Sequence, residues 1–474
     1  MMEALRALAG VALPWVLGYA WVRALREFGA TNPYVEWGYG HFLGILLLTL
    51  VMRLVGWVGA PLSLGVLAPL VVVLVGAGTT FAYVRERRHR PVPAAALPIP
   101  DADPLAIRGL ALIVAVLLVL RTGTLAVDVL LRPLFPWDAW TQWATKARVW
   151  SGLHAFVPFI PWDVWLTRAP GYTDPAPHYP ATIPLLQTWM TLALGRWDDA
   201  LMNLPWLAGY VALALAIFGQ LRQMSISAAW SLFALYAVLS LPLLDAHVAL
   251  AGYADFHVAA AFALAMLALI AWEKNRARVQ LLLFGFAVVL LPLLKIPGRA
   301  WAVIAVVGLL VAAFGKSWKR LLAVGIGASA AVAMIAVVFW RERIEAVAGA
   351  PQTEVGRPLV DNLFLFDNWH LLWFVLPIIV AVGWRDAIGA MRGASVALAC
   401  GVLFLFAVFV GTRVGDWVTD YTTVNRALLH LAPAATVFGA VLIWSWALRR
   451  NANARPDATI NKLAGRAAGT ASSE

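Results

Sequence analysis

The chain has 474 residues, of which 62% are hydrophobic and 13% are charged. Soluble domains carry roughly 25% charged and about 45–50% apolar residues, so this composition excludes an ordinary soluble fold and indicates that lipid surrounds most of the chain. The net charge of +11 does not indicate a nucleic-acid partner. The basic residues gather in short connections between apolar runs, which is the positive-inside pattern of membrane proteins.

Apolar runs recur along the chain, and several reach the ~20 residues that a helix needs to cross a bilayer. We therefore predict an all-α, polytopic membrane bundle of about 13 transmembrane helices, with interfacial helices in the first large outer loop. The spans are expected near residues 8–24, 41–58, 63–84, 107–131, 200–221, 227–246, 253–272, 280–294, 300–315, 321–340, 370–385, 394–412 and 427–448.

Basic clusters between the spans predict the orientation of the chain. They are expected to be cytoplasmic, which places the N-terminus outside and the C-terminus inside. Residues 179–195 are apolar enough to cross, but a crossing there would move two later clusters outside, so we expect this segment to lie along the outer surface. The clusters are at residues 85–88, 273–278, 316–320, 385–392 and 449–450.

The spacing of the spans and one linker divide the chain. The linker is rich in proline and alanine and lies on the cytoplasmic side. Two long outer loops, 132–199 and 341–369, interrupt the main membrane module, and the second is expected to act as a lid. The expected parts are three accessory spans in 1–90, the linker 91–106, the main module 107–448 and a disordered cytoplasmic tail 449–474.

The first outer loop opens with an acidic residue in an aromatic setting. Pro136 ends the preceding span, Asp138 follows directly, and the next tryptophans with Lys146 and Arg148 are typical of an amphipathic interfacial helix. Asp138 either caps this helix or is a functional carboxylate, and the sequence leaves both interpretations open.

Two acid-x-His pairs follow at the next outer turn, Asp245 with His247 and Asp255 with His257. Carboxylate oxygens and imidazole nitrogens bind divalent cations, so Asp255 and His257 form a candidate metal site. The spacing matches no established ligand motif, and solvated turn residues are the alternative. A divalent cation is the only cofactor that these residues suggest.

Cations also stand on the outer side, where the positive-inside bias disfavours them. Lys295 interrupts two apolar spans, and Arg413 and Arg426 flank the last outer turn. A phosphate clamp is the functional interpretation for Lys295 and Arg426, because lysine supplies a point charge and arginine a bidentate donor. Pairing with a carboxylate or with lipid phosphate is the alternative.

Two further candidates, Asp174 and His178, lie in the proline-rich part of the first outer loop. A histidine in such a loop can act as a base or ligand, although a hydrogen-bonded structural role is more common. The sequence does not separate these roles.

Taken in order, these motifs resemble the C-type glycosyltransferase superfamily of polytopic membrane enzymes that use polyprenyl-phosphate sugar donors. The resemblance covers roughly residues 107–448, and the order and sidedness of the motifs carry it. The motifs are PWDAW with Asp138, HYPATIPLLQTW with His178, GYADFH with Asp255, LLKIPG with Lys295 and NRALLHLAP with Arg426.

The resemblance implies an inverting sugar transfer to an acceptor hydroxyl on the periplasmic face of a bacterial inner membrane. Asp138 would then be the general base, and Asp255 a second catalytic carboxylate that orients the acceptor or holds a cation. Lys295 and Arg426 would stabilise the leaving lipid phosphate. Lipid, glycan and protein acceptors all stay open. The pattern departs from the family at Ala139, where a second acid is usual, and at His257, where an apolar residue is expected.

Three other classes compete with this interpretation. A secondary transporter would place its ionisable groups near the bilayer midplane and would often show repeated halves. A ligase or polymerase of lipid-linked glycans would share the lipid donor and a basic outer surface. A structural subunit of an envelope assembly machine would need no aligned set of acids and cations.

Overall fold

The computed structural model describes residues 1–26, 31–88, 103–314 and 355–453. Within these ranges the elements are helices, and strand-like pairing is limited to isolated bridge positions, such as the bridge between Phe159 and Tyr172. Eight of the helices are long and apolar enough to cross a membrane, or nine when one bent pair is counted as a single span. The chain is therefore a multi-pass helical membrane protein, as the composition predicts.

The eight long helices account for the strongest of the predicted spans. Three weaker predictions correspond to shorter apolar helices, α12 (Arg278–Leu294), α13 (Gly298–Phe314) and α16 (Leu372–Val382). With 11 residues α16 is about 16 Å long, well short of a ~30 Å hydrocarbon core. The span expected at 321–340 lies outside the described residues. The long helices are α1 (Met2–Leu25), α2 (Pro33–Trp57), α3 (Leu64–Arg88), α4 (Leu105–Leu131), α8 (Leu204–Gln223), α11 (Asp255–Asn275), α18 (Arg392–Gly411) and α20 (Ala432–Asn453).

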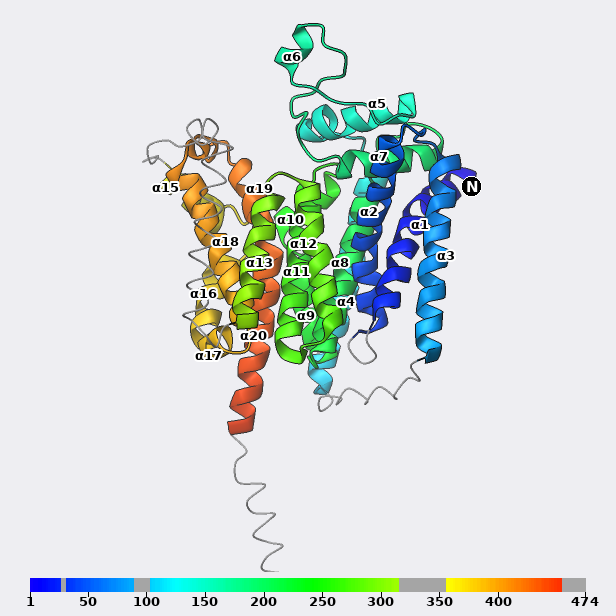
Figure 1. Ribbon diagram of the computed structural model, residues 1–474. Coiled ribbons are helices and arrows are strands. Elements are labelled where there is room, and N and C mark those ends of the chain that lie inside the picture. The colour runs from blue at the N-terminus through cyan, green and yellow to red at the C-terminus, as the bar shows by residue number, and fades with distance from the viewer. Residues whose placement is uncertain (27–30, 89–102, 315–354, 454–474) are drawn as a thin grey trace, which may run out of the picture.

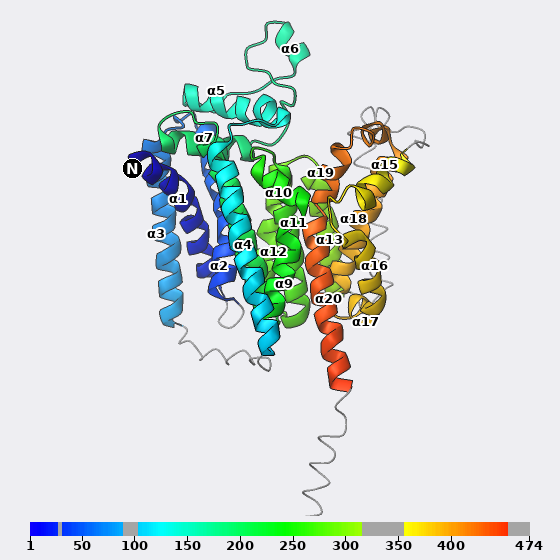
Figure 2. The same ribbon diagram turned by 180° about the vertical axis from the view of Figure 1, so that it is seen from behind.

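The two ends of the bundle differ in character (Figures 1 and 2). One end, here the loop end, carries the N-terminus with α5 (Thr145–Leu153), α6 (Trp162–Leu166) and α7 (Thr182–Leu194). At the opposite end, here the tail end, α3 and α20 finish with arginines in their last turns. This sidedness agrees with the orientation that the basic clusters predict.

The first three helices pack closely against the rest of the bundle. Asn32 caps α2 and also donates to the carbonyl of Gly219 at 2.8 Å, while the hydroxyl of Tyr39 donates to Leu264 at 2.8 Å. Gly38 lies so close to the backbone of Ala216 in α8 that a side chain would not fit. Helices α1 to α3 therefore contribute to the same two hydrophobic clusters as the main module.

Helix α7 lies at the loop end and is not among the helices long enough to cross a membrane, as the basic clusters predict (Figure 1). It is covered by protein, however, because 12 of its 13 residues are buried. Trp189 donates to the carbonyl of Gly10 in α1 at 2.7 Å. Gln187 donates to Asn203 at 3.0 Å. Its apolar character thus reflects protein packing under α5 and beside α1, because hydropathy alone does not separate contact with lipid from contact with protein.

The bent pair consists of α9 (Ala228–Leu239) and α10 (Pro242–Ala249), which meet at 66°. The break leaves carbonyls at the end of α9 without helical partners. Arg121 of α4 donates to two of them, Leu239 and Ser240, each at 3.1 Å, and also pairs with Asp245. Arg121 and Asp245 therefore stabilise this bend.

Candidate active site

Asp255 is the centre of the site, at the first position of α11 and with no exposed surface. Its Oδ1 atom accepts from Lys295 Nζ at 2.7 Å and from His430 Nε2 at 2.9 Å. Its Oδ2 atom accepts from Arg426 Nε at 3.2 Å. One buried carboxylate thus receives donors from three side chains on two segments of the chain, which is the arrangement that makes a buried charge tolerable.

Asp138 joins this group through Arg426. Its Oδ2 atom accepts from Arg426 Nη1 at 2.7 Å, and the two side chains are 23% and 22% exposed, so this corner of the site is open to solvent. The capping interpretation is not supported, because Asp138 makes no side-chain cap bond to the π-helix η1 (Ala139–Ala144) that follows it. The acid–cation cluster, as we call it below, consists of Asp138, Asp255, Lys295, Arg426 and His430.

The turns that hold the two cations follow from local sequence. Lys295 ends α12 in an extended conformation, and Gly298 three residues later approaches the carbonyl of Leu291 too closely for any side chain. Arg426 lies on the short helix α19 (Thr423–Leu429). Asp420 caps this helix by accepting from the backbone N–H of Thr423 at 2.9 Å.

The glycine and tyrosine of the GYADFH motif bring the first outer loop to the cluster. Gly252 has a φ of +114°, and a Cβ there would lie 2.8 Å from that of Ala139, next to Asp138. Tyr253 lies under Arg426, whose guanidinium is 4.8 Å from the ring centroid. The carbonyl of Tyr253 accepts from Trp206 at 2.8 Å. The motif therefore supplies a close backbone approach and a cation–π contact besides its carboxylate.

His430 is a member of the cluster that the sequence did not single out. Trp301 Nε1 donates to His430 Nδ1 at 3.0 Å, so the imidazole proton lies on Nε2 and points to Asp255. His430 stands four residues after Arg426, on the same face of the chain's last helical stretch. That spacing in NRALLHLAP is the only signal that could have indicated it.

The electrostatic balance of the cluster depends on burial. Burial lowers the pKa of Lys295 below its usual value, and the negative charge of Asp255 opposes this shift. Tyr179, from the HYP motif, responds to the same charges: burial and then Asp255 raise the pKa of its hydroxyl. Tyr179 therefore keeps its proton at neutral pH, and it is a second neighbour of the site that the sequence did not assign.

Asp174 and His178 lie away from the cluster. Asp174 is buried against Lys146, with 2.6 Å between Oδ2 and Nζ, and both residues bond to the backbone of Ala176. Lys146 thus does not reach the membrane interface as predicted. His178 is exposed in the loop. The structure gives Asp174 a structural role and brings neither residue to Asp255.

The candidate metal site does not assemble. His257 is buried and faces Trp206, with ring centroids 4.9 Å apart, while the carboxylate of Asp255 is directed to its three donors. Asp245 is engaged by Arg121. Among the residues that the structure describes, no group of three or more His, Cys, Asp or Glu side chains is placed to hold a metal ion. The residues at Asp255 therefore do not fit a divalent cation.

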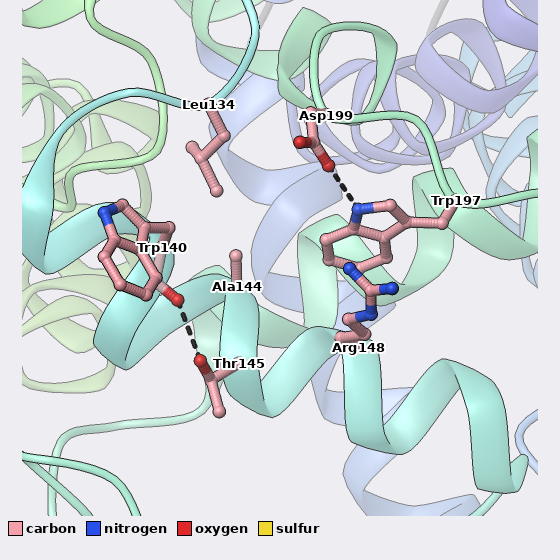
Figure 3. Close-up of a pocket in the computed structure, with 7 residues that line it drawn as sticks. All are labelled: Leu134, Trp140, Ala144, Thr145, Arg148, Trp197 and Asp199. Carbon is pink, nitrogen blue, oxygen red and sulfur yellow. Dashed lines mark hydrogen bonds between the residues drawn. The ribbon is translucent and has the colours of Figure 1, made fainter.

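Beside the cluster, a cavity of about 320 Å³ lies along the first outer loop (Figure 3). None of its lining residues belongs to the acid–cation cluster. Trp140 of η1 contributes to its wall, so the cavity and Asp138 share one short element.

The fold and the site together define a class: a multi-pass helical membrane protein with a buried acid–cation cluster at the loop end of its bundle. No family model, no curated protein and no solved structure matches the chain. Its function must therefore be argued from the site itself.

Proposed function

We propose that this protein is a membrane glycosyltransferase of the bacterial inner membrane, which transfers a sugar from a polyprenyl-phosphate donor to an acceptor hydroxyl with inversion. One observation carries the proposal: two carboxylates and two cations from four distant motifs meet at the loop end of the bundle. Direct bonds link them in the order Lys295, Asp255, Arg426 and Asp138. Such a set suits a reaction that moves a proton from the acceptor and releases an anionic phosphate.

The chemistry assigns a role to each side chain. Asp138 accepts the proton of the acceptor hydroxyl as its oxygen attacks the anomeric carbon of the donor sugar. The bond between that carbon and the phosphate oxygen breaks, and the electron pair leaves with the lipid phosphate. Lys295 and Arg426 stabilise the developing negative charge, and Asp255 positions both cations.

In the structure Arg426 is bonded to Asp138, so this carboxylate is not free to accept a proton. A donor phosphate would compete for the same guanidinium, because its oxygens match the donor fork of arginine. Arg426 also bonds to Asp255 through Nε, at 3.2 Å, while Nη1 holds Asp138. Turning Nη1 toward the phosphate frees Asp138 without releasing Arg426 from Asp255. Binding of the donor thereby releases Asp138 to act as the general base.

The position of the cluster favours this proposal over transport. Asp255 begins α11 and Lys295 follows the last residue of α12, so both stand at helix ends and not at mid-helix. Transporters place such groups near the bilayer midplane, on interrupted helices.

The test is a transfer assay in membranes with radiolabelled polyprenyl-phosphate sugars. Asp138→Asn should reduce transfer by roughly 10²–10⁴-fold, the usual contribution of a general base. Lys295→Ala should also reduce transfer at matched expression. The control is Asp128→Asn, because Asp128 is an exposed acid near the end of α4, paired with Arg132, and this change should leave transfer intact.

Unchanged transfer by Asp138→Asn would remove Asp138 from the mechanism. No transfer by any form, the unsubstituted protein included, would contradict the glycosyltransferase proposal. It would favour a transporter, an assembly subunit or an enzyme that joins lipid-linked glycans.

A further inference from the structure

The cavity along the first outer loop has the lining of a ligand site (Figure 3). At about 320 Å³ it is within the range of small-molecule pockets. Its wall combines indoles, a guanidinium, a carboxylate and a hydroxyl with little aliphatic surface. The lining residues are Leu134, Trp140, Ala144, Thr145, Arg148, Trp197 and Asp199.

Two tryptophans form opposite sides of this cavity, and both are held in place. Figure 3 shows Trp140 on one side and Trp197 on the other, with Ala144 between them. The indole N–H of Trp197 donates to Asp199, and the guanidinium of Arg148 lies 5.3 Å from the Trp197 rings. Trp140 packs edge to face against Trp137, with ring centroids 5.2 Å apart. The cavity thus offers two preorganised aromatic faces, which lowers the entropy cost of binding a flat ligand between them.

The charges of the lining side chains balance. Arg148 contributes one positive charge and Asp199 one negative charge, and Thr145 adds a neutral hydroxyl. A phosphate or a lipid headgroup would require an excess of donors and positive charge. A neutral ligand rich in hydroxyl groups can instead accept from Arg148 and donate to Asp199.

We propose that this cavity binds a neutral sugar unit. A pyranose ring has C–H-rich faces that pack against indole rings and a rim of hydroxyl groups that matches a guanidinium and a carboxylate. The cavity supplies the indole rings on two of its walls, and it supplies the guanidinium of Arg148 and the carboxylate of Asp199 beside them.

The position of the cavity defines which sugar would occupy it, and this step rests on the proposed function. Asp138 lies on the same side of η1 as Gln142, which donates to it at 3.4 Å. Trp140, between them in sequence, projects from another side of that helix into the cavity. Because Asp138 and the cavity lie on different sides of η1, an oligosaccharide can place one unit at each. The acceptor is therefore a glycan chain, with its reacting end at Asp138 and a more distant unit in the cavity.

Binding can be measured without transfer, so the two proposals can fail separately. The purified full-length protein, in detergent, is applied to an array of neutral oligosaccharides of three to six hexose or pentose units. Trp140→Ala and Trp197→Ala should each weaken retention by about tenfold, the effect of losing one aromatic contact of ~1.4 kcal/mol. Trp162→Ala is the matched control, because Trp162 is exposed in the same loop and does not line the cavity.

Trp197→Phe keeps an aromatic ring but loses the second ring of the indole and the bond to Asp199. It guards against a misfolded alanine variant and should weaken retention less. Retention of no glycan, or equal retention by the tryptophan variants and the control, would overturn the sugar site. The protein could instead retain no glycan but bind vesicles of phosphatidylglycerol, and the tryptophan variants could lose that binding. This result would overturn the sugar site in favour of a site for a lipid headgroup. Glycan retention that depends on both tryptophans, in a protein that transfers no sugar, would support the cavity and contradict only the glycosyltransferase.

Discussion

Two buried lysine–aspartate pairs stand at the loop end, and they differ in what surrounds them. Lys146 lies 2.6 Å from Asp174 and Lys295 lies 2.7 Å from Asp255, with every side chain 7% exposed or less. The first pair is closed: the N–H and carbonyl of Ala176 satisfy one partner each. The second pair is open, because Asp255 also bonds to Arg426 and through it reaches the solvent-exposed edge of the site.

The difference separates a structural pair from a chemical one. A closed pair fixes one loop conformation, and the further contact of Lys146 is with the ring of Phe159, which carries no charge. An open pair shares its charge with a group that can change partner. Burial and pairing distance are nearly the same in both pairs, so neither quantity by itself identifies a functional site.

The largest expected effect comes from removing one acid of each pair. Asp174→Ala and Asp255→Ala each leave a buried lysine without its counter-charge, which should cost about 3–5 kcal/mol of unfolding free energy. Denaturant titration of the purified protein measures this loss. A much smaller loss for either variant would mean that the lysine is solvated or neutral in the folded protein.

Replacing both members of a pair should sharpen the comparison. Lys146→Met with Asp174→Leu removes two buried charges together, so the unfolding free energy should return to within about 1 kcal/mol of the unsubstituted protein. Lys295→Met with Asp255→Leu should recover less, because Arg426 and His430 lose their partner. Sugar transfer should survive the first double change and be lost in the second. Loss of transfer in both would contradict the structural role of Lys146 and Asp174.

The sequence predicted much of the cluster because its members break local rules. Lys295 and Arg426 are cations on the side where the positive-inside bias removes them, and Asp138 and Asp255 are acids next to apolar spans. Each position was therefore informative in isolation. The structure adds that the four side chains meet.

The role of His430, the cavity and the burial of α7 could not be predicted from the sequence, because each depends on contacts between distant segments. His430 lies near the start of the predicted span 427–448, and its bonds to Trp301 and Asp255, which join distant parts of the chain, show its role. The cavity needs Trp140 and Trp197, which stand far apart in the chain. Hydropathy likewise placed the long helices but could not show that α7 is covered by protein, since lipid and protein interiors are equally apolar.

A smaller effect is expected from the bond that orients His430. Trp301→Phe leaves His430 Nδ1 without a donor, which should cost about 1–3 kcal/mol of unfolding free energy. Trp189→Phe is the matched control, because it removes an equivalent buried bond to Gly10, away from the cluster. Both variants should lose similar stability, but only Trp301→Phe should lower kcat for transfer. An equal effect on kcat in the two variants would make His430 a packing residue.

The smallest effect is expected at an exposed ion pair. Arg132 and Asp128 are 2.9 Å apart, as close as the buried pairs to within a few tenths of an ångström, but their side chains are 45% and 40% exposed. Water and salt screen such a pair, so Arg132→Ala should change the unfolding free energy by no more than about 0.5 kcal/mol. The same titration, repeated at low and high salt, measures it. A loss comparable to that of Asp174→Ala would show that distance, and not burial, sets the strength of these pairs, and the contrast between closed and open pairs would then lose its physical basis.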